Sequence, residues 1–335
     1  MGRALLDLLD AKASILASRY GLEFSVVGAA DSSGSVIDPG GICPRSLSLH
    51  KAAGRAIAGF PHAAPGMSAP EMLRMVQADM LVEASAVNLA TGQPGLDCCR
   101  IALQRGMAVV LANKAPLVHG FRELSETASA GHVGLAYSAT VCGALPVINI
   151  GRRDLGTAEL ESVRGVFNST SNFILGSMAR GREFADALAE AQAAGVAEAD
   201  PALDLQGWDT ANKLVIIANS VLGQPARLDD VTPVTGITDI DIRQIREAKQ
   251  AGKVIKLVAS ALRRGSIYHL RVQPEWLPEN DFLATVSDWE MGIVFETDTM
   301  GRQQYKVDER GPVPTAATVL RDVVNLAANR AEASA

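Results

Sequence analysis

Short apolar runs alternate with helical patterns between residues 23 and 139, and this alternation is the strongest constraint on the fold. The strand-like runs and the helical patterns that separate them are 23–30, 69–76, 79–84, 94–106, 107–111, 120–130 and 134–139. Such spacing is typical of βαβ units in a parallel sheet. We therefore predict an α/β chain whose N-terminal part is a doubly wound, Rossmann-like sheet. The segment 36–59 has no clear pattern, and we expect it to be irregular apart from one helical piece near 47–57.

Small and polar residues follow three of the predicted strands. They are Asp31 and Ser32 after the first run, Ser85 after the second, and Asn113 and Lys114 after the third. In doubly wound sheets, ligands bind beyond the carboxyl ends of the strands. We therefore expect a cofactor at this edge of the sheet.

The second half of the chain has a different texture and predicts an α+β region. Its strand-like and helical patterns are 160–167, 171–180, 183–194, 208–221, 253–261, 267–273 and 291–297, followed by a last helix at 315–328. Helices and strands here no longer alternate regularly, so we expect a second domain.

Composition narrows the classes of protein further. The 335 residues carry a net charge of −6, and 48% are hydrophobic against 20% charged, which excludes a disordered chain. Scattered basic residues predict no nucleic-acid partner. The apolar runs are too short for a membrane span, and the first residues lack a signal-peptide pattern. The four cysteines indicate reduced thiols in a cytoplasmic protein.

The stretch 191–213 is the most informative for chemistry. Glu198, Asp200 and Asp204 lie in a loop bounded by glycine and proline, and Asp209 and Lys213 follow it four residues apart. Residues four apart share one helix face, so the last two form an ion pair. A surface salt bridge is the plain interpretation, but the helix continues with apolar residues, which places Lys213 at the border of buried surface.

This stretch matches the signature of the homoserine dehydrogenase family at each defined position. Further segments resemble the same family in the same order, and they are 31–41, 88–94, 112–117, 139–148, 165–175 and 314–322. The resemblance spans essentially the whole chain and leaves no room for a regulatory domain or a fused aspartate kinase. It implies a nucleotide-binding domain at 1–133, completed by the C-terminal helix 312–335, and a dimerisation and substrate domain at 134–311.

The resemblance also implies an activity, namely the interconversion of L-homoserine and L-aspartate 4-semialdehyde with NAD or NADP, on the route to threonine, methionine and isoleucine. Lys213 is then the general acid and base, with Asp209 beside it and Lys114 as a second lysine that bridges cofactor and substrate. The substrate-binding residues implied are Glu198, Asp204, Asp209, Asn168 and Thr170. Ordinary turn capping is an alternative for Asn168, Thr170 and Ser171.

The implied cofactor contacts are Gly2, Arg3, Asp31, Ser32, Ser85, Asn113, Lys114 and Gly311. Gly2 resembles the last glycine of the family's phosphate-binding turn, and the strand and first glycines before it are absent from the sequence. A further departure is Asp308-Glu-Arg-Gly311, where the family has a glycine-rich string. Asp31 favours NAD, whereas Arg45 and Lys51 suit a 2′-phosphate, so the choice of nucleotide stays open.

Two further features follow from the resemblance alone. It implies a monovalent cation, such as sodium, on the backbone carbonyls of Ser138, Val141, Gly143 and Leu145, although Ser138 replaces the usual glutamate. It also implies a homodimer formed through the substrate domain. Two other functions remain open, a catalytically impaired homologue that keeps the fold as a binding protein, and a dehydrogenase acting on a related amino-acid semialdehyde.

Overall fold

The computed structural model describes residues 1–333, with side chains as far as residue 329. The chain divides into two compact units. The first contains Met1–Gly143 together with the C-terminal segment that begins at Gly311, and the second is the continuous segment Ala144–Arg310. None of the described helices is long and apolar enough to span a bilayer.

A three-stranded parallel sheet lies in the first unit. Its strands are β4 (Met80–Glu83), β5 (Ala108–Leu111) and β6 (Leu135–Ala136), in that order, and the connecting helices are α4 (Gly95–Gln104) and α5 (Ala115–Ala130). The side chains of β5 are fully or almost fully buried, as expected for a parallel strand covered on both faces. This confirms the predicted βαβ units.

The strand β1 (Val26–Asp31) belongs to a different sheet from the one predicted. It pairs antiparallel with β2 (Gly34–Ile42), which pairs antiparallel with β3 (Ala63–Pro65). The prediction of an irregular segment was wrong for the first part of 36–59, since it holds most of β2. The predicted helical piece near 47–57 overlaps α2 (Pro44–Ala52), and the short turn η1 (Ile57–Gly59) follows it. Each of these two sheets has three strands, and no pairing joins them in the described part of the chain.

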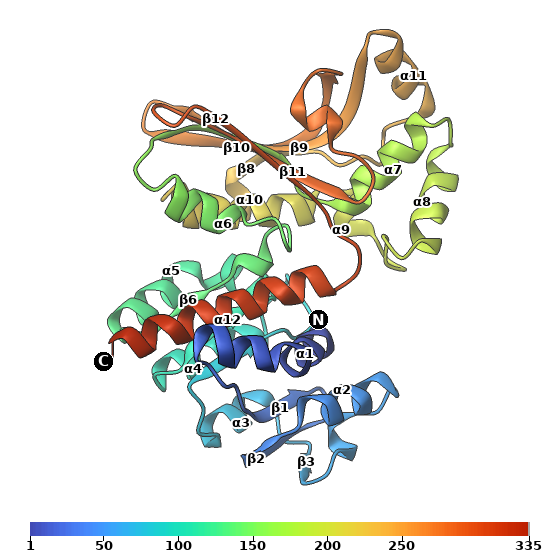
Figure 1. Ribbon diagram of the computed structural model, residues 1–335. Helices are drawn as coiled ribbons and strands as arrows, with labels where there is room; N and C mark the ends of the chain where they lie inside the picture. The colour runs from blue at the N-terminus through green and yellow to red at the C-terminus, as the bar shows by residue number, and fades with distance from the viewer. Residues whose placement is uncertain (334–335) are drawn as a thin grey trace. The chain divides into compact units, whose positions relative to one another are not determined.

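Three further helices complete the first unit, and they are α1 (Gly2–Tyr20), α3 (Ala69–Met75) and α12 (Val313–Ala333). Helices α1 and α12 lie side by side, although they come from opposite ends of the sequence (Figure 1). Their apolar faces form one buried cluster with β5, which includes Leu5, Leu16, Val110, Val319 and Val323. Ser68 and Glu71 form a reciprocal capping box at the start of α3.

The second unit is built on a six-stranded sheet. Its strands, in spatial order, are β12 (Arg302–Asp308), β11 (Glu290–Thr297), β7 (Leu160–Val166), β9 (Lys253–Arg264), β10 (Ile267–Pro278) and β8 (Val231–Val234). All neighbouring pairs are antiparallel except β10 and β8. The longest strands, β9 and β10, form a hairpin that pairs from end to end.

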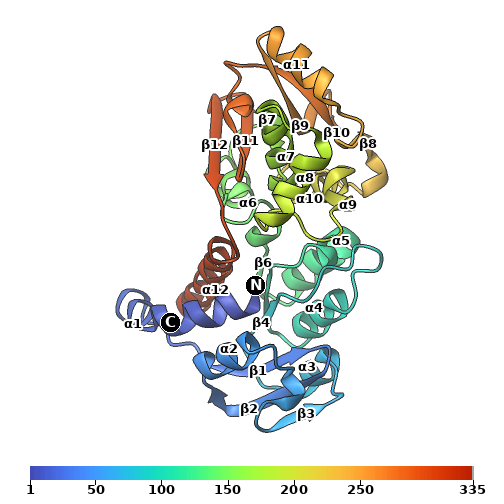
Figure 2. The same cartoon turned by 90° about the vertical axis from the view of Figure 1, so that its right-hand side faces the viewer.

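Helices pack against this sheet, and Figure 2 shows α7, α8 and α10 together beside it. The longer helices are α7 (Ser169–Ala179), α8 (Phe184–Ala193), α10 (Trp208–Ser220) and α11 (Ile242–Gln250). The short ones are α6 (Val147–Asn149), η3 (Ile150–Asp154), α9 (Ala202–Leu205), η4 (Leu228–Asp230) and η5 (Phe282–Thr285). A further short helix, η2 (Ser138–Thr140), belongs to the first unit. This mixture is the predicted α+β region.

Candidate active site

Lys213 and Asp209 form a buried ion pair on α10. The Lys213 Nζ lies 2.7 Å from Asp209 Oδ2, and the two side chains are only 13% and 9% exposed. The ammonium also donates to the main-chain oxygen of Phe167 at 2.6 Å. The helix starts after Gly207, whose φ of 85° suits glycine. The plain interpretation as a surface salt bridge was therefore wrong.

Asn168 joins this pair to a second carboxylate. Its Nδ2 donates to Asp209 Oδ2 at 2.8 Å and to Asp204 Oδ1 at 2.7 Å. Burial, and then the negative charge of Asp209, raise the pKa of Asp204 above its ordinary value. One amide thus lies between two acids and beside the lysine, all in the second unit.

The other predicted substrate residues have different settings. Thr170 is buried and donates to the main-chain oxygen of Val196 at 2.9 Å. Ser171 N donates to the Asn168 side chain at 2.8 Å, so Asn168 also caps α7. Glu198 is exposed, and its main-chain oxygen accepts from the Gln192 side chain. The structure brings Asn168, Asp204, Asp209 and Lys213 together, with Thr170 at their edge.

In the first unit, Ser85, Asn113 and Lys114 follow the carboxyl ends of β4 and β5, as predicted. Glu83, the last residue of β4, was missed by sequence reasoning. It is 5% exposed, and its Oε1 accepts from the Ser85 N–H at 2.9 Å and from the Ser85 hydroxyl. Its main-chain oxygen accepts from the N–H groups of Ala112 and Asn113. An acid at the end of an apolar strand was the available signal.

Asp31 is fully engaged by its own chain. One oxygen accepts from the Ser33 N–H and hydroxyl, and the other from Lys51 Nζ at 2.5 Å and the Ile57 N–H at 3.0 Å. Burial raises its pKa, but the hydrogen bonds from Lys51 and Ser33 outweigh this and hold the pKa well below the usual range. Lys51 thus neutralises the carboxylate that favoured NAD in the sequence, while Ser32 and Arg45 are exposed.

The predicted phosphate-side residues lie at helix starts. Gly2 is the first residue of α1, Arg3 follows it, and both are exposed. A Cβ at Gly2 would meet nothing within 4 Å, so the conformation there does not demand glycine. Gly311, with φ of 70°, lies two residues before the first residue of α12, Val313.

The residues proposed for a cation follow one another along the crossover segment. Ser138 donates its N–H and its hydroxyl to the buried carboxylate of Asp322, at 2.9 and 3.1 Å. Cys142 and Gly143 both have positive φ, 56° and 53°. The described residues contain no group of three His, Cys, Asp or Glu side chains that could hold a metal.

The acidic residues before α12, Asp308 and Glu309, have bonding partners within the second unit. Arg310 pairs with Asp308 at 3.1 Å and lies over the ring of Trp289. Glu309 accepts from the N–H of Ala144 at 2.9 Å. The Asp308 and Glu309 charges thus have partners of their own in this chain.

A parallel nucleotide-type sheet and a separate unit with a buried lysine–carboxylate pair are typical of a dehydrogenase that binds a dinucleotide. The family model described as Homoserine dehydrogenase matches residues 146–324, more than half of the chain. A homoserine dehydrogenase of Methanocaldococcus jannaschii is 34% identical over 97% of this chain and 95% of its own length. The NAD(+)-dependent homoserine dehydrogenase of Pseudomonas canavaninivorans is 31% identical over 97% and 93%.

Solved structures agree with these relatives. The putative homoserine dehydrogenase from Archaeoglobus fulgidus is 35% identical, with a TM-score of 0.86 over 97% of this chain and 95% of that one. A hyperthermophilic archaeal homoserine dehydrogenase in complex with NADPH has the same fold, with a TM-score of 0.82 at 24% identity over 98% and 94%. This chain belongs to the homoserine dehydrogenase family.

Proposed function

We propose that this chain is a homoserine dehydrogenase that interconverts L-homoserine and L-aspartate 4-semialdehyde with NAD or NADP. The single observation that carries this is the buried pair of Lys213 and Asp209 in a member of the family. In this proposal the reaction belongs to threonine, methionine and isoleucine biosynthesis.

The residues of the second unit account for the proton. A bound nicotinamide nucleotide would supply the acceptor for the hydride of the alcohol carbon. The hydroxyl of homoserine must lose its proton in the same reaction, and Lys213 Nζ, in its neutral amine form, takes it as the general base. Asp209 and the Phe167 carbonyl fix the position of that nitrogen, at 2.7 and 2.6 Å. Asp204, Thr170 and the exposed Glu198 offer oxygens to the ammonium of the substrate.

The first unit supplies groups that fit a dinucleotide. Ser85, Asn113 and Lys114 lie beside the ends of two parallel strands, and Glu83 holds the Ser85 hydroxyl and the Asn113 amide in place there. Gly2, Arg3 and Gly311, at the starts of α1 and α12, suit phosphates, since a helix N-terminus favours negative charge. We propose that both nucleotides are used, because Lys51 neutralises Asp31 and so lowers the repulsion of a 2′-phosphate.

Initial-rate assays test this function. We expect oxidation of L-homoserine with NAD and with NADP, followed as absorbance of the reduced nucleotide. The absence of turnover with either nucleotide would remove the proposal. Replacing sodium by choline in the same assay tests for a cation on the carbonyls of Ser138, Val141, Gly143 and Leu145. If sodium binds there, the rate should be higher in sodium than in choline.

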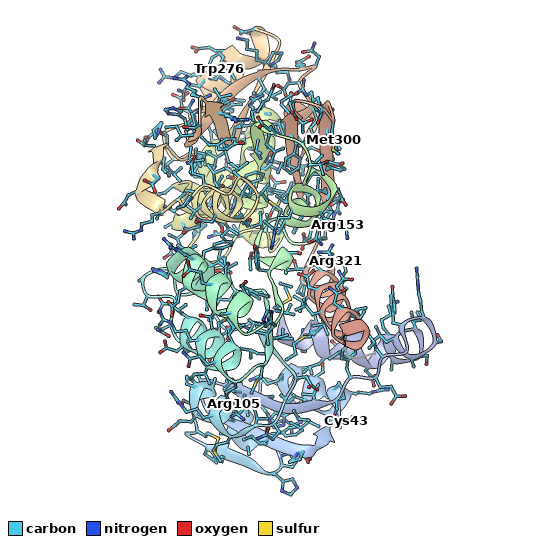
Figure 3. All side chains as sticks on the ribbon, turned by 90° about the vertical axis from the view of Figure 1, so that its left-hand side faces the viewer. Cys43, Arg105, Arg153, Trp276, Met300 and Arg321 are labelled. Carbon is cyan, nitrogen blue, oxygen red and sulfur yellow. The ribbon has the colours of Figure 1, made fainter. Side chains whose placement is uncertain are left out.

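We also propose a homodimer formed through the second unit, in a cytoplasmic protein. The four cysteines are free thiols, which suits a reducing compartment. Large apolar side chains are exposed on this unit, among them Leu262 (42%) and Ile267 (54%), and Figure 3 labels two more, Trp276 and Met300.

The dimer has a simple test in solution. Sedimentation velocity should show two copies for the wild type and a shift toward monomer for Leu262→Glu, because a charge in an apolar interface is costly. The matched control is Met75→Glu, at a 62% exposed position of the first unit, which should leave the dimer intact. A wild-type monomer would contradict the proposal.

A further inference from the structure

Asn168 has an arrangement that substrate binding does not explain, and the argument rests on the function proposed above. Both hydrogens of its Nδ2 are used within the chain, one by Asp204 at 2.7 Å and one by Asp209 at 2.8 Å. Its Oδ1 accepts from the Ser171 N–H at 2.8 Å. The backbone donor fixes which end of the amide is oxygen, so the two donations are not a matter of choosing a flip.

The setting makes these two donations important. Asn168 is 5% exposed, Asp209 is 6% exposed and Asp204 is half-buried. Two carboxylates that accept from the same amide nitrogen repel each other, and burial penalises each charge. The charge of Asp209 accordingly helps to raise the pKa of Asp204. The amide is the group that both acids share, and its hydrogens point at both of them.

The third member is Lys213. A single oxygen, Asp209 Oδ2, accepts from both Asn168 Nδ2 and Lys213 Nζ. The residue before Asn168 supplies the carbonyl that accepts from the same Nζ at 2.6 Å. The two residues that follow β7 therefore both position the lysine. Phe167 does so directly through its carbonyl oxygen, and Asn168 does so through Asp209.

We propose that Asn168 is a positioning residue, which holds the Asp204 and Asp209 carboxylates apart and in place so that Asp209 presents Lys213 to the substrate hydroxyl. Substrate need not touch it. Its effect on turnover passes through the two acids and the lysine.

Two variants separate this role from helix capping. Asn168→Asp keeps an oxygen that caps α7 but replaces the donating NH2 by an oxygen, which adds a third carboxylate to the cluster. Asn168→Ser keeps a capping oxygen and loses both donations without adding charge. The kinetics of each variant are measured as kcat and KM for homoserine across pH, beside thermal unfolding.

The expected results differ between the variants. For Asn168→Asp, the added negative charge favours the protonated lysine, so the acidic limb of the kcat/KM profile should move up by about one pH unit. For Asn168→Ser, kcat should fall about tenfold or more while KM changes less than about threefold, since the bound state loses its alignment rather than its contacts.

Other outcomes would overturn the inference. If both variants keep the wild-type pH profile and kcat and only lose thermal stability, Asn168 is a helix cap alone. If KM rises with kcat unchanged, it binds substrate directly. A wild-type enzyme without turnover would instead remove the proposed function, so the two failures are distinct. Should the aspartate variant not fold, the serine variant decides.

Discussion

Lys213→Arg should lower kcat for homoserine oxidation by about 10³-fold while the protein stays folded. General base catalysis by a positioned side chain is worth about 10² to 10⁴ in rate. The guanidinium keeps a positive charge beside the buried Asp209, but it cannot release a proton at working pH. Steady-state kinetics with saturating nucleotide measure the loss, and thermal unfolding checks the fold.

A second substitution and a control make this result specific. Lys213→Met removes both charge and base, so it should lose as much activity and some stability as well, because a carboxylate is left buried without its cation. Lys249→Met, at an exposed position of α11, should change neither. Retention of more than a tenth of wild-type kcat in Lys213→Arg would take the general base role away from Lys213.

Lys256 should give the protein a pH-dependent stability above pH 8. This lysine of β9 is 5% exposed, and its Nζ donates to Asn172 Oδ1 at 2.8 Å and to the Val286 carbonyl at 2.5 Å. Burial lowers the pKa of Lys256 to about 8 from its ordinary value of 10.5. The nearby charges of Asp288 and Glu290 oppose this shift without reversing it.

The direction in which the free energy of unfolding changes with pH follows from proton binding. Between pH 8 and 10.5 the unfolded chain holds a proton on this lysine that the folded chain has released, so stability rises with pH. Relative to Lys256→Met, the free energy of unfolding of the wild type should therefore rise by about 3 kcal/mol across that window. The gain is present above the unfolded pKa and is lost as the pH falls through 8. Urea unfolding at several pH values measures it.

The comparison with the methionine variant cancels other titrating groups. Lys249→Met serves again as the control, because an exposed lysine should give curves parallel to the wild type. If Lys256→Met is also parallel to the wild type, the buried amine does not titrate in this range. Activity is not needed for this measurement, so it stands apart from the proposed function.

Much of the fold could be predicted because buried strands and amphipathic helices have regular periods. The strand β2 was missed because its sequence holds Pro39, Gly40 and Gly41, which are typical of a turn. In the structure these residues lie where the pairing register with β1 shifts, between Ile37 and Ile42, so they form an irregularity in the ladder and have no partners of their own in β1. Edge strand β12 was missed because most of its residues are polar.

The site was predictable only where it is local in sequence. The spacing of Asp209 and Lys213 places them on one helix face. The contact of Asn168 with Asp204 and Asp209 spans 36 and 41 residues, and no periodic pattern encodes it. For the same reason, Lys51 as the partner of Asp31 required the structure. Glu83 and Ser85 are only two residues apart, but they form no helix-face or strand-face pattern that would have pointed to their hydrogen bond.

The division of the first unit between the two ends of the chain has a consequence for synthesis on the ribosome. The core of that unit needs Val319 and Val323, which emerge after all of the second unit has been made. The continuous segment Ala144–Arg310 can close first, and the bond from Ala144 N–H to Glu309 brings its two ends together. Until α12 has been synthesised, the apolar faces of α1 and β5 stay exposed to solvent. The nascent enzyme therefore passes through a stage with exposed apolar surface that chaperones would recognise.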